Sequence, residues 1–426
     1  MKLSIQYLPL TGKLALGLTL LAVQARAGDW PQWRGPNRDG VSQETGLLQE
    51  WPKDGPKLVW SVKDIGAGYS TPSVVGDRIY LLSNEGLEKE SVIALATKDG
   101  GRIWAAPLGK VGHPTQQPNY PAARSTPTVE GGALFTLGSD GDLICLDSAT
   151  GKERWRKNLR TDFGGQPGEW AYSESPLIDG DALICTPGGA NATMVALNKK
   201  TGATIWQCAV PEGGGAAYAS AIMVTSGGVK QYVQLLQKGL VGVDAKSGRL
   251  LWRYAKPVSR YGANIPTPLA SDGVIYTASA GTGGGAVKLV MKGGQPEPEE
   301  LYFDLKRPSA IGGAVTVGDF LYGTTTQGMQ CFDIKTGAKK WDERGLGAAS
   351  LLVADGRLYL HGENGEVALV EATPDAYREK GRFTPPDEPK RANQMEKAWT
   401  YPALADGRLY IRDKNMLWCY DVKAGK

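Results

Sequence analysis

Histidine is nearly absent from this chain, and cysteine is sparse. The 426 residues include two histidines, His113 and His361, so a nucleophile–histidine dyad or a histidine-rich metal site has almost no material. The five cysteines are an odd number without an adjacent pair, which argues against a disulfide framework. Histidine-dependent catalysis and a disulfide-stabilised scaffold are therefore disfavoured.

A strong net charge is also lacking. Lysine and arginine number 48 against 44 aspartate and glutamate residues, a formal net charge of +4. Loss of the leader described next would remove Lys2, Lys13 and Arg26 and leave a net charge of about +1. Such a balance offers no electrostatic reason to bind nucleic acid or an anionic membrane, so we expect neither as a partner.

The most apolar stretch of the N-terminal region, residues 14–23, is too short for a membrane span. Two lysines precede it and an Ala-x-Ala site ends at Ala27, a pattern that predicts a secretory signal peptide over residues 1–27. No cysteine follows, so the lipid-anchoring cysteine of a bacterial lipoprotein is missing. We expect a soluble monomer that begins near Gly28, has no membrane span, and is periplasmic or secreted.

Tryptophan and glycine, in contrast, recur together at fixed spacing. In five places a small residue lies ten positions before a tryptophan and a glycine lies four positions before it. These sets are Ala94/Gly100/Trp104, Cys145/Gly151/Trp155, Ala196/Gly202/Trp206, Gly242/Gly248/Trp252 and Cys331/Gly337/Trp341. A sixth set is split across the chain, with Cys419 and Gly425 near one end and Trp60 near the other. A unit of short strands and turns that repeats about every 40 to 50 residues predicts a radial β architecture.

A hairpin explains the spacing within each set. A three-residue loop at 149–151 would pair Ser148 with Lys152 and place Cys145 opposite Trp155. Directly opposed side chains share one face with Cβ atoms about 5 Å apart, so a bulky indole needs a small partner. The cysteines in these positions are therefore expected to be small, buried apolar side chains: Cys145, Cys331 and Cys419.

Each hairpin is preceded by two more short strands, the first often after a Thr-Pro or Ser-Pro step and the second often after a Gly-Asp or Asp-Gly turn. First strands are expected near residues 71, 126, 175, 219, 267, 313, 349 and 400. The eighth unit ends one strand short, and residues of about 57–63 can supply the missing outer strand and close the ring. The chain is thus predicted to be an all-β, eight-bladed propeller of four-stranded antiparallel blades. Residues 28–426 form its single domain, with 28–56 as an extension packed on it.

The repeat resembles the tryptophan-docking repeat of pyrroloquinoline-quinone-like propellers. The pattern Ala-x-Asp-x-x-Thr-Gly-x-x-x-Trp recurs with small variations at 145–155, 196–206, 242–252 and 331–341. That superfamily contains the quinoprotein alcohol dehydrogenases and the outer-membrane assembly scaffold BamB. The segment Asp-Trp-Pro-Gln-Trp-Arg-Gly-Pro-Asn-Arg-Asp-Gly at 29–40 further resembles exported proteins of this type that are common in planctomycetes. The resemblance covers residues of about 57–426 and implies the fold more strongly than an activity.

Quinone-dependent oxidation is the activity that the resemblance raises first. Such dehydrogenases hold pyrroloquinoline quinone over the channel with Ca²⁺ bound by Glu, Asn and Asp side chains, and keep an Asp as base. No local motif of this chain matches those ligands or that base. We therefore expect a non-catalytic scaffold without catalytic residues, metal or cofactor. A pyrroloquinoline-quinone-dependent dehydrogenase, or another enzyme at the channel rim, is the alternative.

The links from each outer strand to the next inner strand should converge on one rim of the channel. Aromatic and arginine side chains there would suit a binding surface for an envelope or extracellular protein, or for a ligand. Alternatively, the tyrosines fill the channel and cap the strand ends. The candidate rim residues are Tyr69, His113, Tyr120, Arg124, Trp170, Tyr172, Glu174, Tyr218, Arg260, Tyr261 and Asn264. The tryptophans expected to be structural are Trp60, Trp104, Trp155, Trp206, Trp252 and Trp341.

Other motifs have ordinary interpretations. Asp140-Gly141-Asp142 is expected to be a hairpin turn rather than a calcium loop, and the glycine runs at 213–215 and 281–285 precede no helix that could bind phosphate. The fifth and seventh units lack the tryptophan. Their acidic and proline-rich stretches, 295–300 and 384–391, are expected to be solvated excursions.

Two further tryptophans, Trp30 and Trp33, precede the strand that closes the ring. They either contact a partner or pin the N-terminal segment against the propeller. Pinning is the favoured interpretation.

Overall fold

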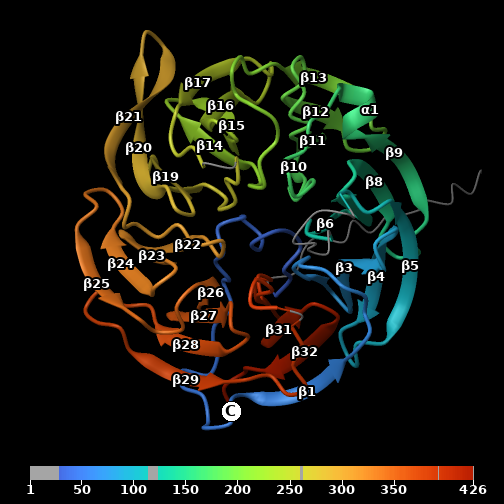
Figure 1. The fold of residues 1–426 in the computed structure, drawn as a ribbon, viewed down its shortest axis with the longest axis vertical. Coiled ribbons are helices and arrows are strands. Elements are labelled where there is room, and N and C mark those ends of the chain that lie inside the picture. The colour runs from blue at the N-terminus through green and yellow to red at the C-terminus, as the bar shows by residue number, and fades with distance from the viewer. Residues whose placement is uncertain (1–27, 114–122, 260–261, 392, 426) are drawn as a thin grey trace, which may run out of the picture.

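The computed structural model describes residues 28–113, 123–259, 262–391 and 393–425. These residues form eight four-stranded antiparallel sheets around a central axis (Figure 1). The predicted eight-bladed propeller is therefore confirmed. The predicted signal peptide, residues 1–27, lies outside the described residues.

The blades follow one another in chain order. In blades 1 to 7 the chain runs from the inner to the outer strand, whereas the outer strand of blade 8, β1, comes from the N-terminal side. Blade 1 is β2 Ser73–Val75, β3 Arg78–Glu85, β4 Lys89–Ala96 and β5 Arg102–Gly109, and blade 2 is β6 Thr128–Glu130, β7 Ala133–Leu137, β8 Asp142–Asp147 and β9 Glu153–Asn158. Blade 3 is β10 Leu177–Asp179, β11 Ala182–Cys185, β12 Met194–Asn198 and β13 Thr204–Cys208, and blade 4 is β14 Ile222–Ser226, β15 Val229–Leu236, β16 Gly239–Asp244 and β17 Leu250–Tyr254.

Blade 5 is β18 Leu269–Ser271, β19 Val274–Ser279, β20 Gly283–Lys292 and β21 Gln295–Asp304, and blade 6 is β22 Ala314–Val317, β23 Phe320–Thr324, β24 Met329–Asp333 and β25 Lys339–Glu343. Blade 7 is β26 Ala349–Ala354, β27 Arg357–Gly362, β28 Val367–Glu371 and β29 Glu379–Phe383, and blade 8 is β30 Ala403–Ala405, β31 Arg408–Asp413, β32 Met416–Asp421 and β1 Lys57–Val62. A short helix, α1 Leu159–Phe163, follows β9 and is capped by Asn158.

The turn between the third and fourth strands is one residue longer than predicted. In blade 2 the Asp147 amide donates to the Lys152 carbonyl, and the Gly151 amide donates to the Asp147 carbonyl. Ser148 therefore lies in the turn, and its predicted pairing with Lys152 is wrong. The reason is local: Asp147 Oδ1 accepts hydrogen bonds from the amides of the second and third turn residues, at 3.1 and 3.0 Å, which favours the longer loop.

A bulge on the outer strand compensates for the longer turn. Leu146 pairs with Glu153, Arg154 is the extra residue, and Cys145 again lies opposite Trp155, as predicted. The same register shift occurs in the seven other blades. In five of them a small residue faces an aromatic partner as follows: Ala94 and Trp104, Ala196 and Trp206, Gly242 and Trp252, Ala286 and Tyr302, Cys331 and Trp341. All five cysteines are free and buried.

Five of the six indoles also dock on a turn of the following blade. Trp155 Nε1 donates to the Lys199 carbonyl at 2.9 Å, and a Cβ atom on Gly202 would lie 3.0 Å from the Trp155 ring. Gly202 has a φ of +71°, so the position needs glycine both for its backbone and for the indole. Four other tryptophans bond to a carbonyl of the next blade in the same way: Trp60 to Thr97, Trp104 to Ser148, Trp206 to Ala245 and Trp341 to Thr373.

The ring is closed by the N-terminal strand, as predicted. Strand β1 pairs with β32, and Trp60 lies opposite Cys419. The proposed role of Gly425 as a turn glycine is wrong, since it is absent from the residues with positive φ and no atom lies within 4 Å of a Cβ built on it. The reason is that β32 and β1 are joined by no turn: they come from opposite ends of the chain.

Blade 5 departs from the prediction. Residues 295–300 are not a solvated excursion but belong to β21, which with β20 extends beyond the outline of the ring (Figure 1). Pro296 and Pro298 alternate in this outermost strand, so neither has to donate to the sheet. Residues 384–391 do form a loop, most of it exposed. Its Pro386 carbonyl accepts a hydrogen bond from Trp418 Nε1 at 2.9 Å.

Candidate functional site

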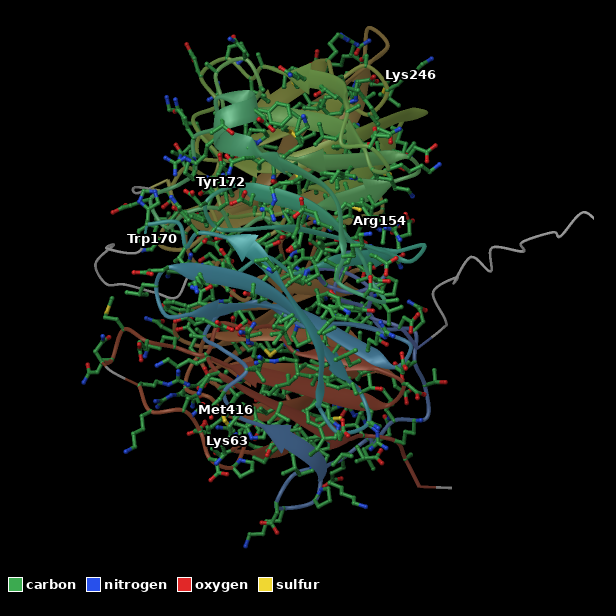
Figure 2. The ribbon with its side chains drawn as sticks, turned by 90° about the vertical axis from the view of Figure 1, so that its right-hand side faces the viewer. Lys63, Arg154, Trp170, Tyr172, Lys246 and Met416 are labelled. Atoms are coloured by element: carbon green, nitrogen blue, oxygen red, sulfur yellow. The ribbon has the colours of Figure 1, made fainter. Side chains whose placement is uncertain are left out.

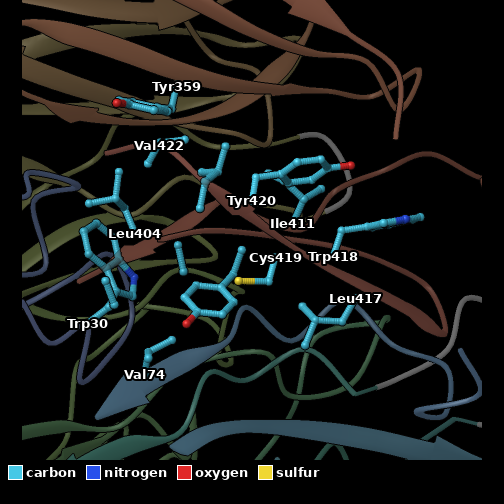
Figure 3. Close-up of a cluster of buried hydrophobic side chains, with 14 of the residues drawn as sticks. Trp30, Val74, Tyr359, Leu404, Ile411, Leu417, Trp418, Cys419, Tyr420 and Val422 are labelled. Carbon is cyan, nitrogen blue, oxygen red and sulfur yellow. The ribbon is translucent and has the colours of Figure 1, made fainter. Parts of the chain in front are cut away.

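Residues 28–42, here called the channel plug, cross the centre of the ring (Figure 1). Trp30 is 1 % exposed and packs in the hydrophobic cluster that blades 7, 8 and 1 share (Figure 3). Hydrogen bonds join the plug to all eight blades, to the residues Val74, Val129, Ser175, Ala221, Thr267, Ala314, Val353 and Asp406. Trp30 thus pins the N-terminal segment against the propeller, the interpretation favoured from the sequence. Trp33 also lines the cavity described below.

Two buried arginines hold the plug. Arg38 donates to the carbonyls of Ser175, Pro176 and Ala221 at 2.8, 3.1 and 3.0 Å, and Arg34 donates to the carbonyl of Ala314. Burial lowers the pKa of Arg38 to about 10, which leaves it charged at neutral pH. A guanidinium offers several donors in a fixed plane, so carbonyl groups from different blades can satisfy one side chain.

The two faces of the propeller differ. The plug meets the face formed by the turns between first and second strands, where the Gly76 amide donates to Asp29 Oδ1 at 2.9 Å. The opposite face carries the links from each outer strand to the next inner strand, and we call it the link face. Trp170, in a link, and Lys246, in a turn, lie at opposite edges of the molecule in side view (Figure 2).

A cavity of about 280 Å³ lies where the links converge. Three aromatic pairs dominate its wall: Trp33 with Tyr401, Tyr69 with Trp399, and Trp170 with Tyr218, with ring centroids 4.6, 5.3 and 6.0 Å apart. Trp33 comes from the plug, which therefore contributes to the wall from within the channel. The described lining residues are Trp33, Tyr69, Arg124, Trp170, Ser173, Tyr218, Ser220, Ala263, Ile265, Ile311, Trp399 and Tyr401.

Four of the predicted rim residues line this cavity: Tyr69, Arg124, Trp170 and Tyr218. Arg124 Nη1 donates to the Trp170 carbonyl at 2.7 Å, which joins two adjacent links. His113 is exposed, has a φ of +53°, and is not among the lining residues. Tyr120, Arg260 and Tyr261 lie outside the described residues.

Three other predicted rim residues are buried in the blades instead. Tyr172 donates to the Pro187 carbonyl at 2.8 Å, Glu174 accepts from the Thr186 amide at 2.7 Å, and Asn264 donates to the Leu236 carbonyl at 2.7 Å. Their exposed fractions are 1 %, 3 % and 0 %. The extended link alternates its side chains, so Ser173 faces the cavity while its two neighbours point into the protein. For these three residues the geometry is that of strand-end packing.

The sequence reasoning missed several lining residues although a signal was present. Trp399-Thr400-Tyr401-Pro402 occupies the same position before an inner strand as Tyr69-Ser70-Thr71-Pro72, so Trp399 corresponds to Tyr69. Applying the rule for aromatic side chains in links to every unit would have included Trp399 and Tyr401. For Trp33 no such rule exists, since the plug belongs to no repeat.

The donor atoms of this site do not fit a quinone cofactor with Ca²⁺. Calcium takes several carboxylate, amide or carbonyl oxygens, but the described lining residues include no Asp, Glu or Asn. Elsewhere in the described chain, no cluster of three His, Cys, Asp or Glu side chains is arranged to hold a metal ion. The Asp140-Gly141-Asp142 turn is occupied by ion pairs, Asp140 with Arg160 and Asp142 with Arg156.

A closed ring of eight blades, in which an aromatic side chain of one blade docks on the turn of the next, defines a tryptophan-docking β-propeller of the pyrroloquinoline-quinone-like superfamily. The family model described as outer membrane protein assembly factor BamB matches residues 88–343. The chain belongs to this family. Within the part of the chain that the structure describes, no helix has the length and apolar character of a membrane span.

Curated relatives are similar over about half of the chain. BamB of Shewanella oneidensis is 24% identical over 230 residues, which are 53% of this chain and 52% of that protein. The quinoprotein alcohol dehydrogenase PedH of Pseudomonas putida is 25% identical over 255 residues, 56% of this chain and 40% of that protein. The match thus spans about half the length of these relatives or less.

Solved structures show the same fold over nearly the whole chain. BamB from Moraxella catarrhalis has a TM-score of 0.60 at 18% identity and covers 87% of this chain and 98% of that one. Quinohemoprotein alcohol dehydrogenase from Comamonas testosteroni has a TM-score of 0.61 at 16% identity, covering 96% and 82%. At these identities the likeness concerns the fold alone.

Proposed function

We propose that this protein is an exported, non-catalytic scaffold of the bacterial envelope that binds a protein partner at its link face. The aromatic cavity on that face carries the proposal, because large, rigid rings held on convergent loops give much contact area for little loss of conformational entropy. Membership of the assembly-factor family and the signal peptide predicted at residues 1–27 support it.

The side chains in the cavity favour binding over chemistry. The described lining residues contain no carboxylate, imidazole or thiol that could act as a general base or nucleophile. Burial raises the pKa values of the Tyr218 and Tyr401 phenols to about 12, so both stay protonated near neutral pH. Arg124 is a permanent cation, suited to contact and orientation.

A site-specific cross-linker tests the proposal in the native envelope. Benzoylphenylalanine at Glu169, an exposed residue next to the cavity, should capture a protein on irradiation. The matched control places the same group at Ile205, which is 50% exposed on an outer strand away from the link face. A defined adduct at position 169 alone supports the proposal, and equal adducts or none at either position reject it.

The match to a quinoprotein alcohol dehydrogenase is the specific observation behind the alternative function. Purified protein would be mixed with pyrroloquinoline quinone and Ca²⁺, and its absorbance spectrum and mass recorded after removal of unbound cofactor. The scaffold proposal predicts no stoichiometric uptake, since the donor set does not fit. Uptake accompanied by dye-linked alcohol oxidation would establish the enzyme instead.

A further inference from the structure

The polar atoms of three aromatic side chains in the cavity wall form hydrogen bonds within the protein. Trp33 Nε1 donates to Thr267 Oγ1 at 2.9 Å, and the Tyr401 hydroxyl donates to the Ile311 carbonyl at 2.9 Å. The Tyr218 hydroxyl accepts from the Trp170 amide at 3.0 Å. These rings therefore offer the cavity their carbon faces and edges, while their polar atoms serve the fold.

From this wall we infer that the cavity binds a neutral aromatic side chain of the partner protein. The inference rests on the proposed function, since it assumes that the link face receives a protein, and it adds the chemistry that this face selects. Flat rings gain from tilted and edge-to-face contacts with other rings in addition to the area that they bury. The three ring pairs of the wall are already tilted or T-shaped, which exposes ring faces and edges from different directions.

Other ligand chemistries fit this wall less well. A sugar would bury several hydroxyl groups, and each buried hydroxyl needs a hydrogen-bond partner. The rings of Trp33, Tyr218 and Tyr401 already use their polar atoms within the protein, and the unpartnered hydroxyl of Ser173 could serve one such group but not several. A quaternary ammonium group suits aromatic cages, but the guanidinium of Arg124 in the same wall would repel it. A ligand with several carboxylates would find one cation among the described lining residues.

An aliphatic side chain is the closest competitor, because it would also gain from leaving water. The test must therefore compare rings with aliphatic groups of similar size. Two acetylated and amidated pentapeptides serve as probes, Gly-Gly-Trp-Gly-Gly and Gly-Gly-Leu-Gly-Gly, with maltose and tetramethylammonium chloride as further probes. Binding to the chain of residues 28–426 would be measured by saturation-transfer difference NMR and isothermal titration calorimetry.

The tryptophan peptide should bind weakly, with a dissociation constant on the order of 1 mM, because one side chain supplies little area. Its saturation-transfer signals should be strongest on the indole protons. We expect the leucine peptide to bind at least about tenfold more weakly, which corresponds to about 1.4 kcal/mol. Maltose and tetramethylammonium should bind more weakly than the tryptophan peptide.

Variants locate the binding. Trp170→Leu and Trp399→Leu keep apolar bulk in the wall and remove one ring each, so both should weaken the tryptophan peptide at least about fivefold. Tyr254→Leu is the control, since Tyr254 lies on outer strand β17 and does not line the cavity. Circular dichroism and the melting temperature would show that each variant is folded, and with two wall variants the loss of one leaves the test intact.

The peptide and cross-linking results test the aromatic selectivity and the scaffold proposal separately. Equal or tighter binding of the leucine peptide, maltose or tetramethylammonium overturns the inference, as does undiminished binding of the tryptophan peptide by both wall variants, or no binding at all. If the leucine peptide binds equally while cross-linking at position 169 persists, the ring selectivity is wrong and the scaffold proposal stands. If cross-linking at position 169 is absent, the scaffold proposal fails independently of the peptide results.

Discussion

At the scale of single residues, the propeller depends on small side chains placed against large ones. The indole of Trp155 lies between Cys145 on its own blade and Gly202 on the next, where a Cβ atom would approach the ring to 3.0 Å. The first contact could be predicted from a hairpin register. The second could not, because it joins two blades whose relative position no local pattern specifies.

Substitution of Gly202 by alanine should destabilise the protein by more than its backbone strain alone. Gly202 and Gly180 both have positive φ values, +71° and +58°, but a Cβ at Gly180 would meet nothing within 4 Å. Gly180→Ala should therefore cost about 1–2 kcal/mol from the left-handed backbone, and Gly202→Ala about 1–3 kcal/mol more from the clash with Trp155. Urea unfolding would measure both, and equal losses would refute docking of the indole on this glycine.

Substitution of Cys145 tests the contact within the blade. Cys145 is 1 % exposed, so Cys145→Leu should overpack the space beside Trp155 and cost about 1–3 kcal/mol. Cys145→Ala should cost about 1 kcal/mol or less, because alanine holds the same position in other blades. Differential scanning calorimetry compares the two, and identical melting temperatures would contradict the cross-strand pairing.

Stability should fall as the pH rises from about 4.5 to about 7 because of buried Glu90. Burial raises its pKa to about 7, while Glu90 Oε2 accepts from the Ser139 amide and hydroxyl. The folded state therefore holds a proton that the unfolded state releases near pH 4.5, so stability is lost between about pH 4.5 and 7. Glu90→Gln should remove the part of this loss that Glu90 causes, about 1–3 kcal/mol, while the part from Glu174, whose burial also raises its pKa to about 7, should remain. Urea unfolding at pH 5 and pH 8 would give the free energy of unfolding of the parent and of the variant. If both lose the same stability between these pH values, groups other than Glu90 cause the pH dependence.

At the scale of strands and turns, alternation and turn residues located nearly every element. Thr-Pro and Ser-Pro steps preceded many of the inner strands, and all eight inner strands lie within three residues of their expected starts. The failure at residues 295–300 has a physical origin: proline and glutamate are rare in strands, but an outermost strand tolerates both, since one of its edges forms no sheet hydrogen bonds. Composition alone cannot distinguish such an edge strand from a loop.

The long hairpin of blade 5 leaves the indole of Trp252 without a docking turn in the next blade. Its Nε1 donates instead to Gln231 Oε1 at 2.5 Å within its own blade. Gln231→Leu should therefore leave a buried N–H without a partner and cost about 1–3 kcal/mol. Gln207→Leu on an exposed position of β13 is the control, expected within about 0.5 kcal/mol of the parent. A near-neutral Gln231→Leu, measured by urea unfolding, would show that the bond contributes little.

At the scale of the whole molecule, the closing strand was predictable and the plug was not. The eighth unit lacked one strand and residues 57–62 had the pattern to supply it. The plug has no periodicity, and its side chains bond to backbone carbonyls that come together when the ring is complete. The cavity shares this origin, since its wall joins links from blades across the ring with Trp33 of the plug.

Two deletions distinguish the role of the closing strand β1 from the role of the channel plug. Removal of residues 28–64 takes away β1 and leaves β32 with an unpaired edge, so we expect oligomers or aggregates in size-exclusion chromatography with light scattering. Removal of residues 28–42 keeps β1 and should give a monomer with a lower melting temperature. A cooperative monomer from the larger deletion would contradict closure by the N-terminal strand.

The pairing of Lys57 in β1 with Asp421 in β32 also determines when the ring can close during synthesis. The strand that closes the ring is among the first parts of the propeller to be synthesised, and its partner is among the last. At about 5–20 residues per second, β1 waits tens of seconds without its neighbour. The ring must remain open throughout that interval, so its closure can follow only after the last blade has been made.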